Sequence, residues 1–238
     1  MQSKGLIGII GAMQIEVEAL CAEMQNKTEE RAGGITFVRG QLYGRELVVA
    51  KCGIGKVFAA ICAQTMIIKY APDVIINSGV GGTLTNKLSI GDVALSTCAV
   101  QHDMDTTPLG DPAGLVSGIN KVYFEADEKV LSDMEKCISS VGVKCVRGII
   151  ATGDVLLDDS ARKQKIHRLF DLPGCECIAC EMEGGAIAQT CYVNNTPFCI
   201  IRAISDGGDE NSSLDYPQFL KMAAENVTAA LKSYIKDM

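Results

Sequence analysis

Acidic residues stand where the apolar runs of this chain end. Glu181 and Glu183 follow "CIAC", Asp206 follows "PFCIIRAIS", and Glu16 follows "GLIGIIGAM". Charged groups leave water at a cost of several kcal/mol unless they are hydrogen-bonded or neutralised. Carboxylates at these positions therefore either cap helices or hold a ligand.

Two of these acids have the types and positions required for proton transfer. Glu16 falls in the first turn of an expected helix, where an acid stabilises the helix dipole. If its carboxylate faced a site, it would repel phosphate and could instead hold and activate a water molecule. Burial of Asp206 would favour its protonated form and suit a general acid, although an Asp here could simply cap the next turn. Arg202, inside the same apolar run, is expected to pair with one of the acids, because a buried unpaired guanidinium is costly.

The elements that must position these groups alternate between strand and helix patterns. Apolar strand-like runs are expected at residues 5–13, 72–82, 91–100, 145–153, 176–180 and 197–205, and the runs at 35–40 and 45–53 alternate like a half-exposed hairpin. Helical spacing is expected at 15–24, 57–70, 126–140, 184–193 and 220–238. Runs this apolar indicate a mainly parallel sheet covered by helices, in which ligands bind at the carboxyl ends of the strands. The acids and Arg202 are therefore expected to converge on one edge.

The start of the last helix and one long loop can be predicted more closely. Asp215 with Gln218 resembles a capping box, and Pro217 would then lie in the first turn of the last helix. Residues 101–122 form the longest irregular segment, and loops of that length are usually functional or disordered. Since no repeat, low-complexity tract or linker interrupts the pattern, we expect one domain over residues 1–238.

Composition limits the function classes. Apolar residues make up 47% of the chain, charged residues 21%, and the net charge is −7. These values are typical of a folded globular protein and argue against a nucleic-acid partner, which requires clustered Lys and Arg. Neither a signal-peptide pattern nor an apolar stretch of bilayer length is found, so no membrane partner and a cytoplasmic location are expected.

The cysteines and the acidic loop do not predict a metal. The chain has eleven Cys and two His, and Cys175, Cys177 and Cys180 are closely spaced. On a strand, Cys177 and Cys180 would point to opposite faces, so reduced thiols explain them better than zinc does. His102, Asp103 and Asp105 could contribute to a hard-metal site, but acids in loops are more often solvated.

The glycine motifs differ in their specificity. "CGIGK" at 52–56 lacks the first Gly and the final Ser or Thr of a phosphate-binding loop, so a tight strand-to-helix turn is expected there. The glycines of residues 79–82 follow a buried strand and would let a ligand approach the backbone, although a turn without a ligand would use the same residues.

Taken together, these motifs resemble those of the 5′-methylthioadenosine/S-adenosylhomocysteine nucleosidases, in the nucleoside phosphorylase superfamily. The resemblance runs nearly end to end, through "IGIIGAMQIEVEAL", "KCGIGKVFAA", "PDVIINSGVGG", "HDMD", "GIIATGD", "CEMEGGAIA" and "PFCIIRAISD". It implies an α/β fold, a three-layer α/β/α sandwich around a central mixed, partly barrel-like sheet. It also implies a homodimer that acts in methionine salvage without a cofactor, hydrolysing the N-glycosidic bond of the nucleoside with water.

The resemblance also implies roles for individual residues. Asp206 would protonate N7 of the adenine and Ser205 would orient it, Glu16 would hold the attacking water, and Glu183 would bind the ribose hydroxyls. Glu181 would pair with Arg202 or a backbone group. The walls of the pocket, with the backbone of Leu157 facing the adenine edge, would come from Met13, Ile54, Val80, Leu156, Leu157, Met182 and Tyr216. Thr106 and Leu109 would enter the pocket of the partner subunit.

Three positions depart from the family's usual residues. Val80 stands where many relatives have a Ser that helps to place the water, and Ser78 could compensate. Leu109 and Leu156 stand where relatives often have aromatic residues, in the 5′-thio pocket and against the base. These departures leave open the preferred 5′ substituent.

Three alternatives remain. A nucleoside phosphorylase of this fold would require fixed cations for phosphate, whereas the turn after the first strand carries Glu16 and no Arg. A hydrolase of futalosine or 5′-deoxyadenosine would use the same acid, Asp206. A non-catalytic nucleoside-binding protein would not require a Glu that activates water.

Overall fold

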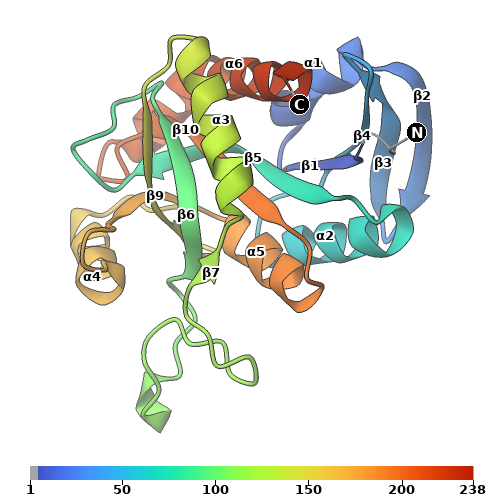
Figure 1. Ribbon diagram of the computed structural model, residues 1–238. Helices are drawn as coiled ribbons and strands as arrows, with labels where there is room; N and C mark the ends of the chain where they lie inside the picture. The colour runs from blue at the N-terminus through green and yellow to red at the C-terminus, as the bar shows by residue number, and fades with distance from the viewer. Residues whose placement is uncertain (1–4, 238) are drawn as a thin grey trace.

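The computed structural model describes residues 5–237. In it, the chain forms a mixed sheet with helices packed around it (Figure 1). The strands are β1 (Ile7–Gly11), β2 (Gln25–Ala32), β3 (Ile35–Leu42), β4 (Arg45–Lys51), β5 (Val74–Thr83), β6 (Val93–Gln101), β7 (Phe124–Glu125), β8 (Cys145–Thr152), β9 (Cys177–Glu181) and β10 (Phe198–Asp206). The helices are α1 (Gln14–Glu23), α2 (Lys56–Tyr70), the 3₁₀ turn η1 (Thr107–Leu109), α3 (Glu128–Ser140), α4 (Ser160–Phe170), α5 (Gly184–Val193) and α6 (Ser212–Asp237).

The sheet closes on itself at one side. Its order is β10-β6-β8-β9-β5-β1-β4-β3-β2, and β10 also pairs with β5, so five strands of the described chain form a closed ring. Parallel pairs join β1 to β4 and β5, β5 to β10, and β8 to β6 and β9, whereas five other pairs are antiparallel. The expected mainly parallel sheet was therefore wrong, and the mixed, partly barrel-like sheet implied by the resemblance is confirmed.

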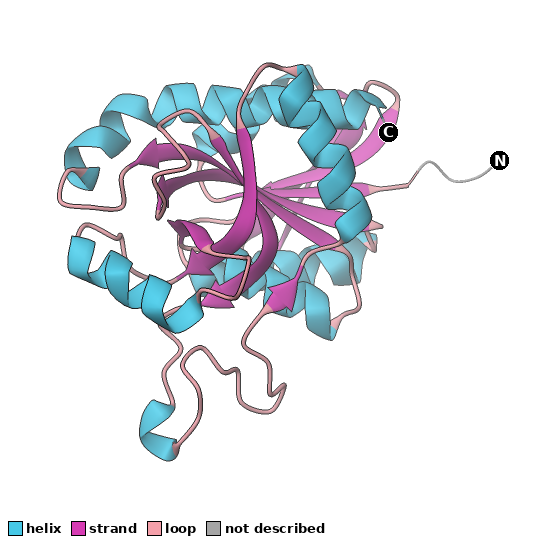
Figure 2. Ribbon diagram, turned by 60° about the vertical axis from the view of Figure 1, so that its left-hand side comes forward, coloured by secondary structure: helices cyan, strands magenta, loops and turns pink. Residues whose placement is uncertain are grey.

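Helices cover the sheet on both sides, as Figure 2 shows. One apolar cluster joins α1, α3 and α6 to the strands, and a second joins α2 and α5 to the other face. The strands lie between these clusters, so most of their residues are buried whichever way they point. This explains why the sequences of the central strands are continuously apolar, whereas β3, nearer the edge of the sheet, alternates between buried and exposed residues.

Besides the short β7 and η1, two longer elements, β2 and α4, were not predicted. β2, "QNKTEERA", is exposed along almost its whole length and is held by antiparallel pairing with β3. α4 covers a third, smaller apolar cluster around Ile166 and Phe170. Because β2 buries no apolar face, its sequence carries no strand periodicity, and only its partner makes it a strand.

The predicted start of the last helix was wrong. α6 begins at Ser212, where Ser212 Oγ accepts the Asp209 N–H at 2.9 Å and the Ser212 N–H donates to the Asp209 carbonyl at 3.0 Å. Asp215 and Pro217 therefore lie inside the helix. The Pro ring leaves the Ser213 carbonyl without a helical donor, and this is tolerated because Ser213 is exposed to water.

Residues 102–123, which we call the arm, leave β6 and project away from the body of the protein in both views (Figures 1 and 2). η1 lies at the tip of the arm. Among the helices of residues 5–237, no segment combines the length and the hydropathy that a bilayer crossing requires.

Candidate active site

A cavity of about 250 Å³ lies beyond the carboxyl ends of β1, β5, β9 and β10. The predicted site residues that line it are Met13, Glu16, Ile54, Val80, Leu156, Leu157, Met182, Glu183, Ser205, Asp206 and Tyr216. Sequence reasoning missed Ala12, Val155 and Cys180 as lining residues. Each lies next to a predicted one, so the strand-end rule could have found them.

Glu16 is fixed by backbone donors. Its Oε2 accepts the N–H groups of Ala12 at 2.7 Å and Met13 at 2.9 Å, and its Oε1 accepts the Val80 N–H at 3.1 Å. The carboxylate therefore caps α1 and also faces the cavity, combining both sequence-based explanations. Burial raises the pKa of Glu16, although Arg202 and the three N–H groups oppose the shift.

A glycine makes this position possible. A Cβ at Gly79 on β5 would overlap with the Glu16 carboxylate and would lie 3.1 Å from Arg202 Nη1. Ser78 precedes it but does not line the cavity, and its hydroxyl has no hydrogen-bond partner among the described residues. Ser78 is therefore not placed to compensate for Val80.

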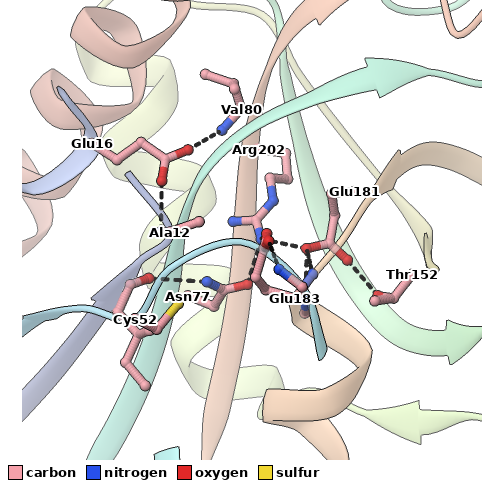
Figure 3. A network of polar contacts seen from close by, with 12 residues as sticks. Ala12, Glu16, Cys52, Asn77, Val80, Thr152, Glu181, Glu183 and Arg202 are labelled. Atoms are coloured by element: carbon pink, nitrogen blue, oxygen red, sulfur yellow. Dashed lines mark hydrogen bonds and ion pairs between the residues drawn. The ribbon is translucent and has the colours of Figure 1, made fainter. Parts of the chain in front are cut away.

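Behind the cavity, Arg202 organises a buried polar network (Figure 3). Its Nη2 donates to Asn77 Oδ1 at 2.6 Å and to Glu181 Oε2, and it lies 3.6 Å from Glu183 Oε2. Burial disfavours the charged guanidinium, but the neighbouring carboxylates, Glu181 first among them, raise the pKa of Arg202. The expected pairing of Arg202 with these acids is confirmed.

Glu181 is the most fully bonded of the acids. Its Oε2 also accepts the N–H groups of Glu183 at 3.0 Å and Gly184 at 2.7 Å, and its Oε1 accepts the Thr152 hydroxyl. The expectation that Glu181 pairs with Arg202 or with the backbone is confirmed, since it does both. Glu181 therefore fixes the turn from β9 into α5, from which Glu183 extends.

Glu183 is held more loosely. Its Oε1 accepts the Gly55 N–H at 2.9 Å, and the carboxyl group lines the cavity with only 6% of the residue exposed. Burial, and then the negative charge of Glu181, raise the pKa of Glu183 to about 7, against the effect of Arg202. Glu183 thus keeps acceptor capacity for a ligand and changes its charge near neutral pH.

Asp206 lies where the cavity meets β10 and is 3% exposed. Its Oδ2 accepts the Ser205 hydroxyl at 2.9 Å, and its Oδ1 accepts the Gly208 N–H at 3.0 Å. A Cβ at Gly82 would come within 2.6 Å of Oδ1 and 3.2 Å of Cys180 Sγ, so the small residue leaves space for both groups. These two donors fix the orientation of the carboxyl group.

The rest of the cavity is apolar. Tyr216 on α6 packs over it and donates its hydroxyl to Met13 Sδ at 3.1 Å. Ile54 and Leu156 lie at its open side and are about half exposed, at 56% and 49%. A mainly apolar cavity with a few convergent polar groups suits a heteroaromatic ring with polar substituents.

Several predicted residues lie outside the cavity. Arg202 stands behind it, and Thr106 and Leu109 lie on the arm, with Leu109 83% exposed. Within residues 5–237, no group of three or more His, Cys, Asp and Glu side chains is arranged to hold a metal ion. Asp103 instead forms an ion pair with Lys56 at 2.6 Å.

The arrangement is suited to cleaving a bond between a sugar and a base. Asp206 can supply a proton to a ligand in the cavity, and Glu183 can accept hydrogen bonds from a diol. The backbone N–H groups fix the orientation of both carboxylate oxygens of Glu16, and this carboxylate can accept a hydrogen bond from a water molecule in the cavity.

Known proteins similar to this chain identify its family. The model of the family described as the phosphorylase superfamily matches residues 6–236. A 5′-methylthioadenosine/S-adenosylhomocysteine nucleosidase of Shewanella halifaxensis is 38% identical over 233 residues, covering 98% of this chain and 99% of that protein.

Two solved structures extend the comparison. The Neisseria meningitidis 5′-methylthioadenosine/S-adenosylhomocysteine nucleosidase in complex with methylthio-immucillin-A has a TM-score of 0.93 and 34% identity, covering 98% of this chain and 100% of that one. The futalosine hydrolase of Helicobacter pylori has a TM-score of 0.92 and 28% identity, with complete coverage of both chains.

Proposed function

The chain belongs to the phosphorylase superfamily, and we propose that within it this protein is the enzyme that hydrolyses 5′-methylthioadenosine and S-adenosylhomocysteine to adenine and the 5′-thioribose. The observation that carries the choice of hydrolysis is the position of Glu16. Three backbone N–H groups hold its carboxylate at the cavity, and none of the described lining residues is Lys or Arg. A phosphate nucleophile would be repelled there, whereas a water molecule would be held and activated.

The proposed reaction begins at the base. Asp206, oriented by Ser205 and Gly208, donates its proton to N7 of the adenine. The electron pair of the glycosidic bond can then move to the base, which leaves as neutral adenine. The anomeric carbon becomes electron-deficient, and the surrounding carboxylates stabilise its positive charge.

The reaction ends at the sugar. Water attacks the anomeric carbon and transfers a proton to Glu16, giving the free 5′-thioribose. Glu183 accepts hydrogen bonds from the ribose hydroxyls, and Arg202 limits the repulsion between Glu183 and Glu181. Met13, Ile54, Leu156, Leu157, Met182, Val80 and Tyr216 would enclose the base and the 5′ substituent.

A product assay tests the proposal. The purified protein is incubated with 5′-methylthioadenosine in phosphate-free buffer, and adenine and methylthioribose are followed by chromatography. Release without phosphate is expected. Strict dependence on phosphate, with a ribose-1-phosphate product, would show a phosphorylase.

Parallel assays address the remaining alternatives. S-Adenosylhomocysteine, 5′-deoxyadenosine and futalosine are compared by kcat/KM, since the departures at Val80, Leu109 and Leu156 bear on the 5′ group. We expect 5′-methylthioadenosine and S-adenosylhomocysteine to be preferred. Tight binding of any of these without turnover would indicate a nucleoside-binding protein.

We further propose that the enzyme works as a cytoplasmic homodimer in methionine salvage. The exposed side of α2 carries Val57, Phe58, Ile61 and Ile68, which are 72%, 54%, 40% and 73% exposed. Such an apolar face is typical of an interface. The arm, which carries Thr106 and Leu109, projects from the body of the protein (Figure 1), where a second subunit could contact it.

A further inference from the structure

We propose that Asp103 is a positioning residue for the active site, because its carboxylate joins three loops and two of them form walls of the cavity. These are residues 52–55 between β4 and α2 together with Lys56 at the start of α2, residues 102–105 at the base of the arm, and residues 153–157 after β8. The inference rests on the proposed function, since it concerns how the nucleoside is held.

The contacts form a closed ring of three residues. Asp103 Oδ1 accepts from Lys56 Nζ at 2.6 Å, and Asp103 Oδ2 accepts the Asp154 N–H at 2.9 Å. Asp154 Oδ1 accepts the Lys56 N–H at 2.8 Å, which closes the ring. The Lys56 and Asp103 side chains are only 19% and 24% exposed, so water screens their ion pair less than a surface pair.

Lys56, Asp103 and Asp154 do not line the cavity themselves, but they hold the neighbouring residues that do. Gly55, immediately before Lys56, donates its N–H to Glu183 Oε1 at 2.9 Å, and Ile54 forms part of the wall. On the other loop, Asp154 is followed directly by Val155, Leu156 and Leu157, which all line the cavity. A shift of either loop would therefore move the apolar wall and the donor to Glu183 together.

The turn before α2 is shaped to fit the ring. Gly55 has a φ of +98°, which a residue with a side chain rarely adopts, and a Cβ there would lie 3.1 Å from Asp154 Oδ1. The glycines and Lys of "CGIGK" therefore serve this turn and its contact with Asp103. Asp105 has a different role in the arm, since its Oδ1 accepts the N–H and the hydroxyl of Thr107.

The charge of Asp103 suits this role. Although desolvation opposes ionisation, the Lys56 ammonium and the Asp154 N–H hold the pKa of Asp103 below its ordinary value. The carboxylate therefore stays ionised at neutral pH, and the ring persists over the range in which Glu183 titrates.

Steady-state kinetics of three variants test the proposal. Asp103→Ala removes both contacts, Lys56→Met removes only the ion pair, and Asp103→Asn keeps an oxygen that can accept the Asp154 N–H. We expect Asp103→Ala to raise KM for 5′-methylthioadenosine by roughly tenfold with kcat changed less than about threefold, because misplaced walls weaken ground-state and transition-state binding alike. Lys56→Met and Asp103→Asn should give smaller increases.

The control is Asp133→Ala, which removes a surface carboxylate paired with Lys129 and Lys136 on α3. It should change neither constant. A folded Asp103→Ala protein with the KM of the wild type would overturn the proposal. If that variant does not fold, an unchanged KM in Lys56→Met and Asp103→Asn would overturn it equally.

The outcome for the proposed function is separate. Wild-type protein that releases no adenine would contradict the proposed function, whatever the variants do. The comparison among variants would then be made on the dissociation constant for 5′-methylthioadenosine, measured by calorimetry, with the same expected order.

Discussion

At the scale of single residues, Glu16 combines two uses of one carboxylate. The N–H groups of Ala12 and Met13 make the contacts of a helix cap, whereas the Val80 N–H comes from β5, and together they hold the group at the cavity. A cap needs only an acceptor, whereas activating water also needs a base. Replacing the acid by its amide separates these uses.

Glu16→Gln should lower kcat by roughly 10²- to 10⁴-fold, the range typical of losing a general base. Affinity for 5′-methylthioadenosine should change far less. Rapid-quench turnover and calorimetric binding measure the two quantities. Glu18→Gln is the matched control, since Glu18 is an exposed acid on the same helix; equal losses in both variants would contradict the proposed role of Glu16.

Glu183 predicts a pH dependence of stability. Its pKa is about 7 in the folded protein and 4.5 when unperturbed, so between these values the folded state binds the additional proton. The contribution of Glu183 to stability is therefore fully present below pH 4.5 and is lost as the pH rises through about 7. Urea denaturation of wild type and Glu183→Gln from pH 4 to 8 measures it, and the wild-type curve should fall relative to the variant. Parallel curves would show that Glu183 does not titrate in this range.

At the scale of elements, close approach between β5 and α1 decides whether the site can form. Gly79 on β5 leaves the space that the Glu16 carboxylate occupies. A conformational argument does not explain this glycine, since it is not among the residues with positive φ. A glycine is required here because the Glu16 carboxylate occupies the space of a Cβ.

Gly79→Ala should therefore displace Glu16, lower kcat and destabilise the fold by about 1–3 kcal/mol, the usual range for overpacking. Thermal unfolding and steady-state kinetics measure the two effects. Ser78→Ala is the control on the same strand, since its buried hydroxyl has no partner among the described residues and its loss should be neutral or stabilising. A Gly79→Ala protein with wild-type kcat would contradict the packing argument.

At the scale of the whole molecule, the exposed apolar face of α2 and the projecting arm are the features on which the proposed dimer rests. Ile54, Val155 and Leu156 are also exposed at the open side of the cavity. A partner that covers this side would bury them and complete the site.

Phe58→Asp should weaken self-association by placing a charge in this face. If the proposed dimer exists, sedimentation velocity will show the variant as a monomer at concentrations where the wild type is dimeric, and KM should rise because the proposed contribution of the partner's arm to the pocket is lost. Leu169→Asp, at a 45% exposed apolar residue on α4, is the control. Identical sedimentation of Phe58→Asp and wild type would place the interface elsewhere.

The amino-acid sequence by itself determined the buried strands, most helices and the candidate site. Continuous apolar runs predicted the strands because both faces of the sheet are covered, and the acids at their ends marked the edge where Glu16, Glu183 and Asp206 meet. A charged residue at the end of an apolar run can be recognised from the local sequence alone. Because burying a charge is costly without a partner or a ligand, such a residue indicates a functional or structural role.

Only the tertiary structure decided which distant segments of the chain contact one another. The ring closure between β5 and β10, the pairing that makes β2 a strand, and the Lys56–Asp103–Asp154 contacts all join segments distant in sequence. Sequence periodicity reports whether a face is buried but not what covers it. The partners therefore became visible only when the chain was folded.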